Sequence, residues 1–168
     1  MSTHVPPPAA TSFPAGTRVA VVAARFNAHL VDELLAGCLR KLGQMGLKDD
    51  GIDVHRVPGA FELPVAAKVL AQTKRYGAVV CLGCVIRGDT PHFDYVAGEC
   101  ARGLQDVSIW EHLPVIFGVL TTNTHEQAVD RVGGAHGHAG ERAAEAAVEM
   151  IAVLDQIAHA GKKKSKAK

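Results

Sequence analysis

The sequence lacks a hydrophobic run of membrane-span length, an excess of charge of either sign and the apolar core of a secretory signal peptide. We therefore expect no membrane partner and a cytoplasmic location, where the four cysteines stay reduced. Five of the 18 Lys and Arg residues lie in residues 162–168, which leaves 13 against 17 Asp and Glu residues elsewhere. The body of the protein is thus slightly acidic, which argues against nucleic acid as a partner.

The length is that of one ordinary domain. The chain has 168 residues, of which 48% are hydrophobic, and this suffices for one sizeable core. We expect an extended proline-rich arm over residues 1–16, a single domain over residues 17–160 and a disordered lysine-rich tail over residues 161–168.

Apolar runs and helical periodicity alternate along the domain. Buried apolar runs predict strands over residues 18–24 and 78–86, and further strands are expected over residues 52–57 and 114–120. Three- and four-residue spacing and helix-start signals predict helices over residues 28–45, 60–75, 93–111, 125–131 and 141–159, with a glycine-rich bend over residues 133–140. Asn27 is the predicted N-cap of the first helix. The alternation predicts βαβ units in an α/β fold, a three-layer α/β/α sandwich with a four-stranded parallel sheet, flavodoxin-like in shape.

The segment after the third predicted strand carries the strongest functional signal. Arg87, Gly88, Thr90 and His92 follow a strand that we expect to be buried on both faces, and a helix follows them. Ligands of open α/β sheets bind beyond the carboxyl ends of the strands, and helix starts bind phosphate. We predict a phosphate cradle that includes Arg87 and Thr90, with His92 beside it as a proton-transfer group. The alternative for His92 is a polar loop histidine that caps the helix.

We predict no metal site. Cys81 and Cys84 have the spacing C-x-x-C, but residues three apart on a strand point to opposite faces, and the sequence offers no second pair at ligand spacing. We interpret both as small apolar core residues. His136 and His138 lie in the glycine-rich bend without an evident third ligand, which is typical of a surface loop.

Three segments together resemble the 6,7-dimethyl-8-ribityllumazine synthases, the enzymes of the penultimate step of riboflavin biosynthesis. They are RFN at residues 25–27, VPGAFELP at residues 57–64 and GCVIRGDTPHFDY at residues 83–95. Phe117-Gly118 and residues 121–131 extend the resemblance. It implies condensation of 5-amino-6-(D-ribitylamino)uracil with 3,4-dihydroxy-2-butanone 4-phosphate, releasing phosphate and water, without a metal or organic cofactor.

The resemblance also implies roles for individual residues. His92 would be the acid/base catalyst. The ribitylaminouracil would be bound by Phe26, which stacks on its ring, and by Ala60, Phe61, Glu62, Cys84, Val85, Ile86 and the Phe117 of a neighbouring subunit. The phosphate would be bound by Gly88, Asp89, Thr90 and the neighbour's Arg131. Taken alone, Phe26 is typical of a core or staple residue, Glu62 of a first-turn carboxylate and Arg131 of a solvated helix-end cation.

The family's assembly is a homopentamer with active sites between neighbouring subunits, so the resemblance implies one here. It leaves open a 60-subunit shell, and riboflavin synthase as a partner. One departure is Ala139, where the family often has a lysine within Asn-Lys-Gly. This departure keeps a second hypothesis open, a shell-forming or flavin-binding paralogue with weak or no turnover. A third is an unrelated phosphosugar-binding α/β domain.

Overall fold

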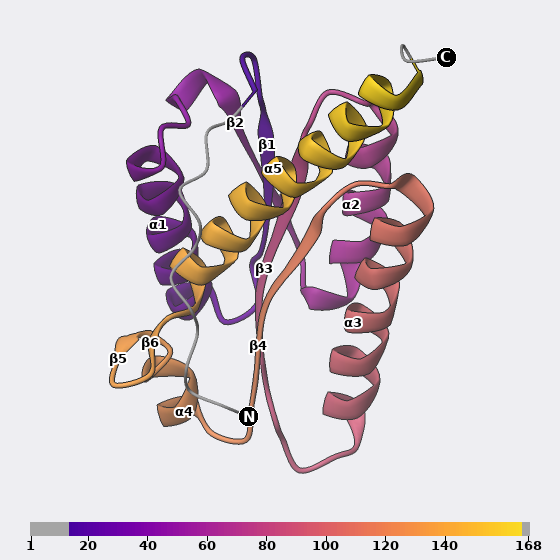
Figure 1. The fold of residues 1–168 in the computed structure, drawn as a ribbon. Helices are drawn as coiled ribbons and strands as arrows, with labels where there is room; N and C mark the ends of the chain where they lie inside the picture. Colours follow the sequence, from indigo (N-terminus) through magenta and orange to yellow (C-terminus); the bar gives the residue numbers. More distant parts are fainter. Residues whose placement is uncertain (1–13, 166–168) are drawn as a thin grey trace.

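The computed structural model describes residues 14–165. The predicted alternation of strands and helices is present along the chain (Figure 1). In order, the elements are β1 (Val19–Ala24), α1 (Ala28–Gln44), a 3-10 turn (Asp49–Gly51), β2 (Ile52–Val57), a 3-10 turn (Ala60–Glu62), α2 (Leu63–Gln72), β3 (Ala78–Ile86), α3 (His92–Glu111), β4 (Val115–Thr122), α4 (His125–Val129), β5 (Val132–Gly134), β6 (Gly137–His138) and α5 (Ala139–Ser165).

The described residues form a parallel sheet in the order β2-β1-β3-β4. Strand β1, one of the two inner strands, pairs with β2 on one side, where Val19 lies opposite Ile52, and with β3 on the other, where Val19 lies opposite Ala78. Every residue of β1 is buried, because helices cover both faces of the sheet. The predicted flavodoxin-like sandwich with a four-stranded parallel sheet is confirmed.

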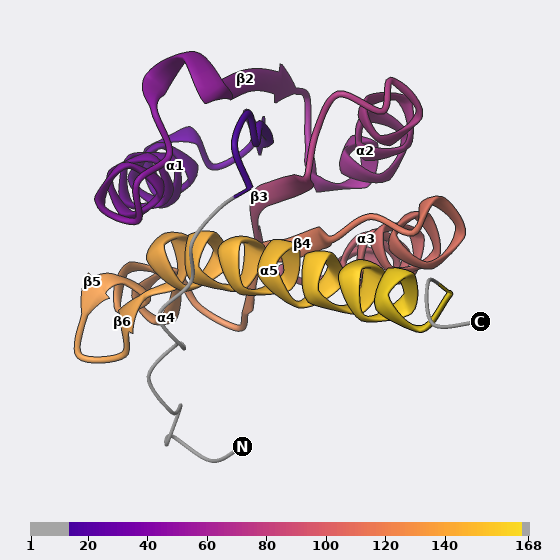
Figure 2. The ribbon, with the colours of Figure 1, turned by 45° about the horizontal axis from the view of Figure 1, so that its top comes forward.

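Helices flank the sheet on both sides (Figure 2), and a hydrophobic core lies between the sheet and each helical layer. Helices α1 and α5 cover one face, and α2 and α3 cover the other. Successive residues of β3 alternate between them: Val80 and Leu82 belong to the first core, and Val79 and Cys81 belong to the second. Cys84 lies in the first core, so Cys81 and Cys84 point to opposite faces, as predicted.

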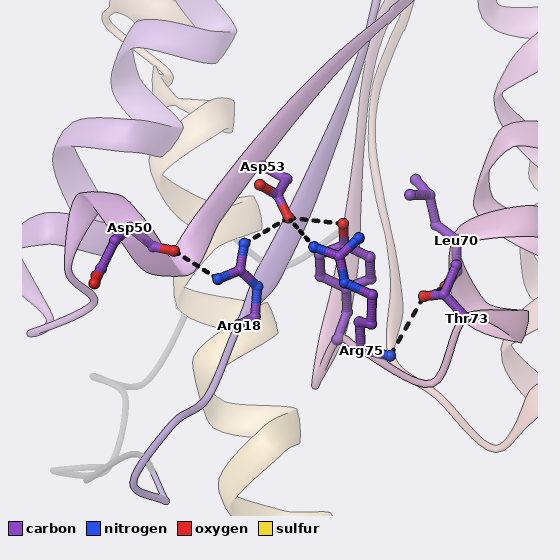
Figure 3. Close-up of polar contacts among 7 residues, drawn as sticks. Arg18, Asp50, Asp53, Leu70, Thr73 and Arg75 are labelled. Atoms are coloured by element: carbon purple, nitrogen blue, oxygen red, sulfur yellow. Dashed lines mark hydrogen bonds and ion pairs between the residues drawn. The ribbon is translucent and has the colours of Figure 1, made fainter.

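A polar cluster holds the amino ends of three strands (Figure 3). Asp53 Oδ2 in β2 accepts hydrogen bonds from Arg18 Nη2 at 2.8 Å and from the Tyr76 hydroxyl at 2.7 Å. Arg75 Nη2 lies 3.6 Å from the same oxygen. Arg18 also donates to the carbonyl oxygen of Asp50 at 2.7 Å. The bond from Arg18 lowers the pKa of Asp53, whereas burial and the bond to Asp53 raise the pKa of Tyr76. The cluster lies at the end of the sheet away from the carboxyl edge.

The structure corrects the ends of several predicted elements. The predicted bend contains the antiparallel hairpin β5–β6, in which Gly133 and Gly137 have φ angles of 120° and 73°. Helix α5 begins at Ala139 rather than residue 141 and continues to Ser165, into the predicted lysine-rich tail. The last residues of that tail, 166–168, lie outside the described residues.

The predicted proline-rich arm also lies outside the described residues as far as residue 13. Its last residues form a turn rather than an extended segment, because the N–H of Thr17 donates to the carbonyl oxygen of Pro14 at 3.2 Å. Within residues 14–165, every helix is too short or too polar to cross a lipid bilayer.

Candidate functional site

A cavity of about 680 Å³ opens at the carboxyl edge of the sheet, where β1 and β3 lie side by side. This is the point at which the strand order reverses, since β1 leads outward to β2 and β3 leads outward to β4. The volume is typical of a small-molecule site. The cavity is lined by Phe26, Asn27, Gly59, Ala60, Phe61, Glu62, Cys84, Val85, Ile86, Gly88, Thr90, His92, Phe93, Tyr95 and Val96.

The loop after β1 forms the first wall. The N–H of Phe26 donates to the carbonyl oxygen of Pro58 at 3.0 Å, and its aromatic side chain is 72% exposed. Asn27 adopts a left-handed conformation with φ 56°, and its Nδ2 donates to the carbonyl oxygen of Cys84 at 3.0 Å. Asn27 occupies the predicted N-cap position of α1, but its side chain makes no capping hydrogen bond and instead joins the ends of β1 and β3.

The 3-10 turn before α2 forms the second wall. The N–H of Gly59 donates to Glu62 Oε2 at 2.8 Å, which fixes the carboxylate at the cavity wall. Ala60 is buried, while the ring of Phe61 is 58% exposed. Glu62 ends the 3-10 turn and directly precedes α2 as its N-cap residue, so it lies near a helix start, as in the simpler interpretation, and also lines the cavity.

The end of β3 and the start of α3 form the third wall. Cys84, Val85 and Ile86 are the last residues of β3, and His92 is the first residue of α3. The first N–H groups of a helix have no partner within the helix, and its dipole favours negative charge there. The 20-residue helix α3 thus brings anion-binding backbone groups and one exposed imidazole to the same cavity.

Arg87 does not line this cavity, which corrects its predicted place in the phosphate cradle. Its Nη2 lies 2.7 Å from Asp94 Oδ1, and its Nε donates to Asn123 Oδ1 at 3.2 Å. The guanidinium also lies over the ring of Phe93, 4.2 Å from the centroid. The pair with Arg87 lowers the pKa of Asp94. Arg87 therefore braces the loop rather than facing the cavity.

Ten of the thirteen predicted site residues line the cavity, and Asp89, Phe117 and Arg131 lie outside it. Asp89 is exposed in the loop between two lining residues. Phe117 is 43% exposed on β4 and lies in a separate groove between β4 and α5. Arg131 follows α4, and its Nη1 donates to the carbonyl oxygen of Gln127 at 2.8 Å.

Five lining residues were not among the predicted site residues, namely Asn27, Gly59, Phe93, Tyr95 and Val96. Tyr95 and Val96 follow His92 by three and four residues, so they share one face of α3 with it. Tyr95 is 67% exposed. The spacing from His92 was a signal that would have identified both residues.

Burial makes the cysteines unreactive as nucleophiles. It raises the pKa of Cys84, which lines the cavity, to about 11, and that of Cys100 to about 11. The thiolate is the reactive form, so neither residue supplies one near neutral pH. In the described part of the chain, three or more His, Cys, Asp or Glu side chains nowhere gather in a group that could hold a metal ion.

The two histidines of the predicted bend, His136 and His138, both contact neighbouring residues of the chain. His136 pairs with the carboxylate of Asp130. The ring of His138 lies against Gly37 in α1, so closely that an added Cβ at Gly37 would lie 2.1 Å from its Cε1. Desolvation lowers the pKa of His138. Both imidazoles lie outside the cavity of their own chain.

Together, an open parallel sheet, a cavity at its topological switch point, a helix start and one imidazole define a small-molecule-binding α/β protein of flavodoxin-like architecture. The comparison with protein families specifies this class further. The 6,7-dimethyl-8-ribityllumazine synthase family model matches residues 16–155. The chain therefore belongs to this family of riboflavin-biosynthesis enzymes, and the resemblance seen in the sequence is confirmed.

Proposed function

We propose that this protein condenses 5-amino-6-(D-ribitylamino)uracil with 3,4-dihydroxy-2-butanone 4-phosphate to form 6,7-dimethyl-8-ribityllumazine, phosphate and water. The observation that carries the proposal is the convergence of ten predicted residues from three separate segments on one cavity of suitable volume. The family match supports the same reaction.

Different parts of the cavity suit the two proposed substrates. An aromatic pyrimidine stacks on an exposed ring such as Phe26, which stands at the cavity edge at the end of β1. The hydroxyls of a ribityl chain donate to a fixed carboxylate, as Glu62 provides. A phosphate ester fits the start of α3, beside Gly88 and Thr90.

His92 is the proposed proton-transfer group. The substrate amine attacks the ketone and water leaves to give an imine, phosphate is eliminated, and ring closure releases a second water. Each step moves protons between substrate atoms, which an imidazole does well near neutral pH. His92 lines the same cavity as Gly88 and Thr90 of the proposed phosphate site and as Cys84, Val85 and Ile86 of β3, which supports its assignment to both substrates.

We further propose a homopentamer whose active sites lie between neighbouring subunits. The lining residues of the cavity include no lysine or arginine in the described chain, although the proposed ligand carries a phosphate. Arg131 of an adjacent subunit supplies this charge in the proposal, and its planar fork matches phosphate oxygens. Phe117, half exposed on the outer strand β4, extends the neighbour's pyrimidine pocket. Sixty-subunit shells and riboflavin synthase complexes are larger assemblies that such a pentamer permits.

The first test mixes purified protein with both substrates and follows lumazine absorbance above the uncatalysed background. Clear acceleration, lost in His92→Ala with assembly retained by sizing chromatography, is the expected result. No acceleration by fully assembled wild-type protein would favour the second candidate, the shell-forming or flavin-binding paralogue. One feature of the sequence favours that candidate: Ala139 stands where the family often has a lysine.

A further inference from the structure

Two histidines far apart in the sequence meet outside the cavity, and the proposed reaction uses neither. His29 lies in the first turn of α1 and His125 is the first residue of α4. Their Nε2 atoms are 2.9 Å apart, the ring centroids are 5.2 Å apart, and the ring planes differ by 27°. Both side chains are exposed. The parallel sheet brings them together, because β1 and β4 deliver their following helices to the same edge.

From this juxtaposition we propose that His29 and His125 chelate one divalent late first-row transition-metal ion, of the class Zn²⁺, Ni²⁺ or Cu²⁺, through their Nε2 atoms. Imidazole nitrogen is a preferred ligand of these ions. Two imidazoles on one metal at 2.0–2.1 Å have nitrogens roughly 2.9 Å apart at a right angle and about 3.3 Å apart at a tetrahedral angle. The observed separation already matches the right-angle arrangement of tetragonal Ni²⁺ and Cu²⁺.

The rearrangement required for chelation is small. At present the two nitrogens face each other, as in a hydrogen bond between a donor tautomer and an acceptor tautomer. Chelation requires both rings to tilt until their lone pairs converge on a point beside the line that joins them. Exposed side chains have the rotamer freedom to do this. A third His, Cys, Asp or Glu ligand is absent from this pair in the described residues, so water completes the coordination shell.

The ion would link two elements of very different stability. Helix α1 has 17 residues and a well-buried face, whereas α4 has five residues, of which Ala128 is the buried one. Helices this short are marginal on their own. A metal that joins His125 to His29 would therefore slow the local opening of α4 much more than that of α1. This inference is independent of the proposed condensation reaction.

The test uses the full chain without an affinity tag, in a buffer that does not chelate metals. Calorimetric titration with ZnCl₂, NiCl₂ and CuCl₂ is expected to show one ion per chain, with Cu²⁺ bound most tightly. Either His29→Gln or His125→Gln should weaken binding by roughly tenfold or more, since the second imidazole acts at high effective concentration. The double variant should lose less binding free energy than the sum of the two single losses, which is the signature of one shared site.

Glutamine keeps a hydrogen bond across the pair but supplies no imidazole ligand, so these variants separate chelation from simple pairing. His159→Gln, which removes another exposed imidazole, is the matched control and should bind like the wild type. Hydrogen exchange should show Zn²⁺-dependent protection of α4 in the wild type and in the control but not in the pair variants. Binding unaffected by His29→Gln, additive losses in the double variant or no binding by the wild type would each overturn the proposal.

Discussion

Asn27 offers a sharp test of how the cavity is held together. It combines a left-handed backbone, φ 56°, with a hydrogen bond from Nδ2 to the carbonyl oxygen of Cys84. Replacement by alanine removes the hydrogen bond, which costs about 1 kcal/mol of folding free energy. Alanine is also disfavoured in the left-handed region, because it lacks the local hydrogen bonding of asparagine, and this costs about 1 kcal/mol more. Asn27→Ala should therefore destabilise the fold by about 2 kcal/mol. Glycine tolerates positive φ, so Asn27→Gly should cost about 1 kcal/mol.

The assay is thermal unfolding of both variants and the wild type at one protein concentration, because assembly makes the midpoint depend on concentration. At about 2–4 °C per kcal/mol for a chain of this size, Asn27→Ala should lower the Tm by roughly 4–8 °C and Asn27→Gly by about half as much. Equal losses in the two variants would refute the backbone argument. An Asn27→Gly variant as stable as the wild type would refute the contribution of the hydrogen bond.

Three further predictions concern catalysis, thiol reactivity and acid stability. His92→Gln should lower the kcat of lumazine formation by roughly 10²–10⁴-fold with an unchanged Tm, and an unchanged kcat would contradict the acid/base role. Burial raises the pKa values of the Cys84 and Cys100 thiols to about 11. These thiols should therefore react slowly with a thiol reagent at pH 8 in the native state and rapidly in urea. Rapid labelling of the native protein would show that burial does not protect them. The lowered pKa of Asp53 contributes stability that is present above its unfolded pKa of about 3.9 and is lost as the pH falls through the lower folded value. Urea midpoints between pH 3 and 7 should thus decline less steeply in Asp53→Asn than in the wild type, and parallel curves would rule the contribution out.

The buried strands were predicted well because parallel strands need apolar residues on both faces. β1 and β3 are covered by helices on each side, so their sequences are nearly continuous Val, Ala, Leu and Cys. Such runs leave little choice of register or boundary. The observed β1 begins one residue later than predicted, and β3 has the predicted bounds.

The hairpin β5–β6 was missed because its glycine-rich sequence is compatible with both a bend and a hairpin. Glycine at 133 and 137 permits positive φ in a bend as readily as in a hairpin. The Asp130 carboxylate accepts the N–H of Ala135 at 2.7 Å and thereby closes the loop. A Cβ at Gly140 would lie 2.0 Å from the carbonyl oxygen of Leu34, so the close approach of α5 to α1 requires glycine there. Contacts of this kind cannot be derived from the local sequence pattern.

The positions of most site residues agreed with the prediction, whereas that of Arg87 did not. The resemblance implied one site formed by residues at or after the ends of β1, β2 and β3, and ten of these residues line one cavity. The carboxyl ends of parallel strands share one edge, which is why these segments meet. Arg87 was misplaced because its partner Asp94 belongs to the next helix, where the side-chain pair is not apparent from the local sequence pattern.

This correction of Arg87 bears on the proposed assembly. With Arg87 engaged by Asp94, the cavity has a carboxylate in Glu62 and helix-start amides for phosphate, but its lining lacks a full positive charge in the described chain. A phosphate dianion in a partly desolvated site strongly favours a cationic partner. If Arg131 of a neighbouring copy is that partner, phosphate recognition and assembly are one property of this protein. A variant that stays monomeric would then retain the surfaces proposed for the pyrimidine at Phe26 and Phe61, yet lose most of its affinity for the butanone phosphate.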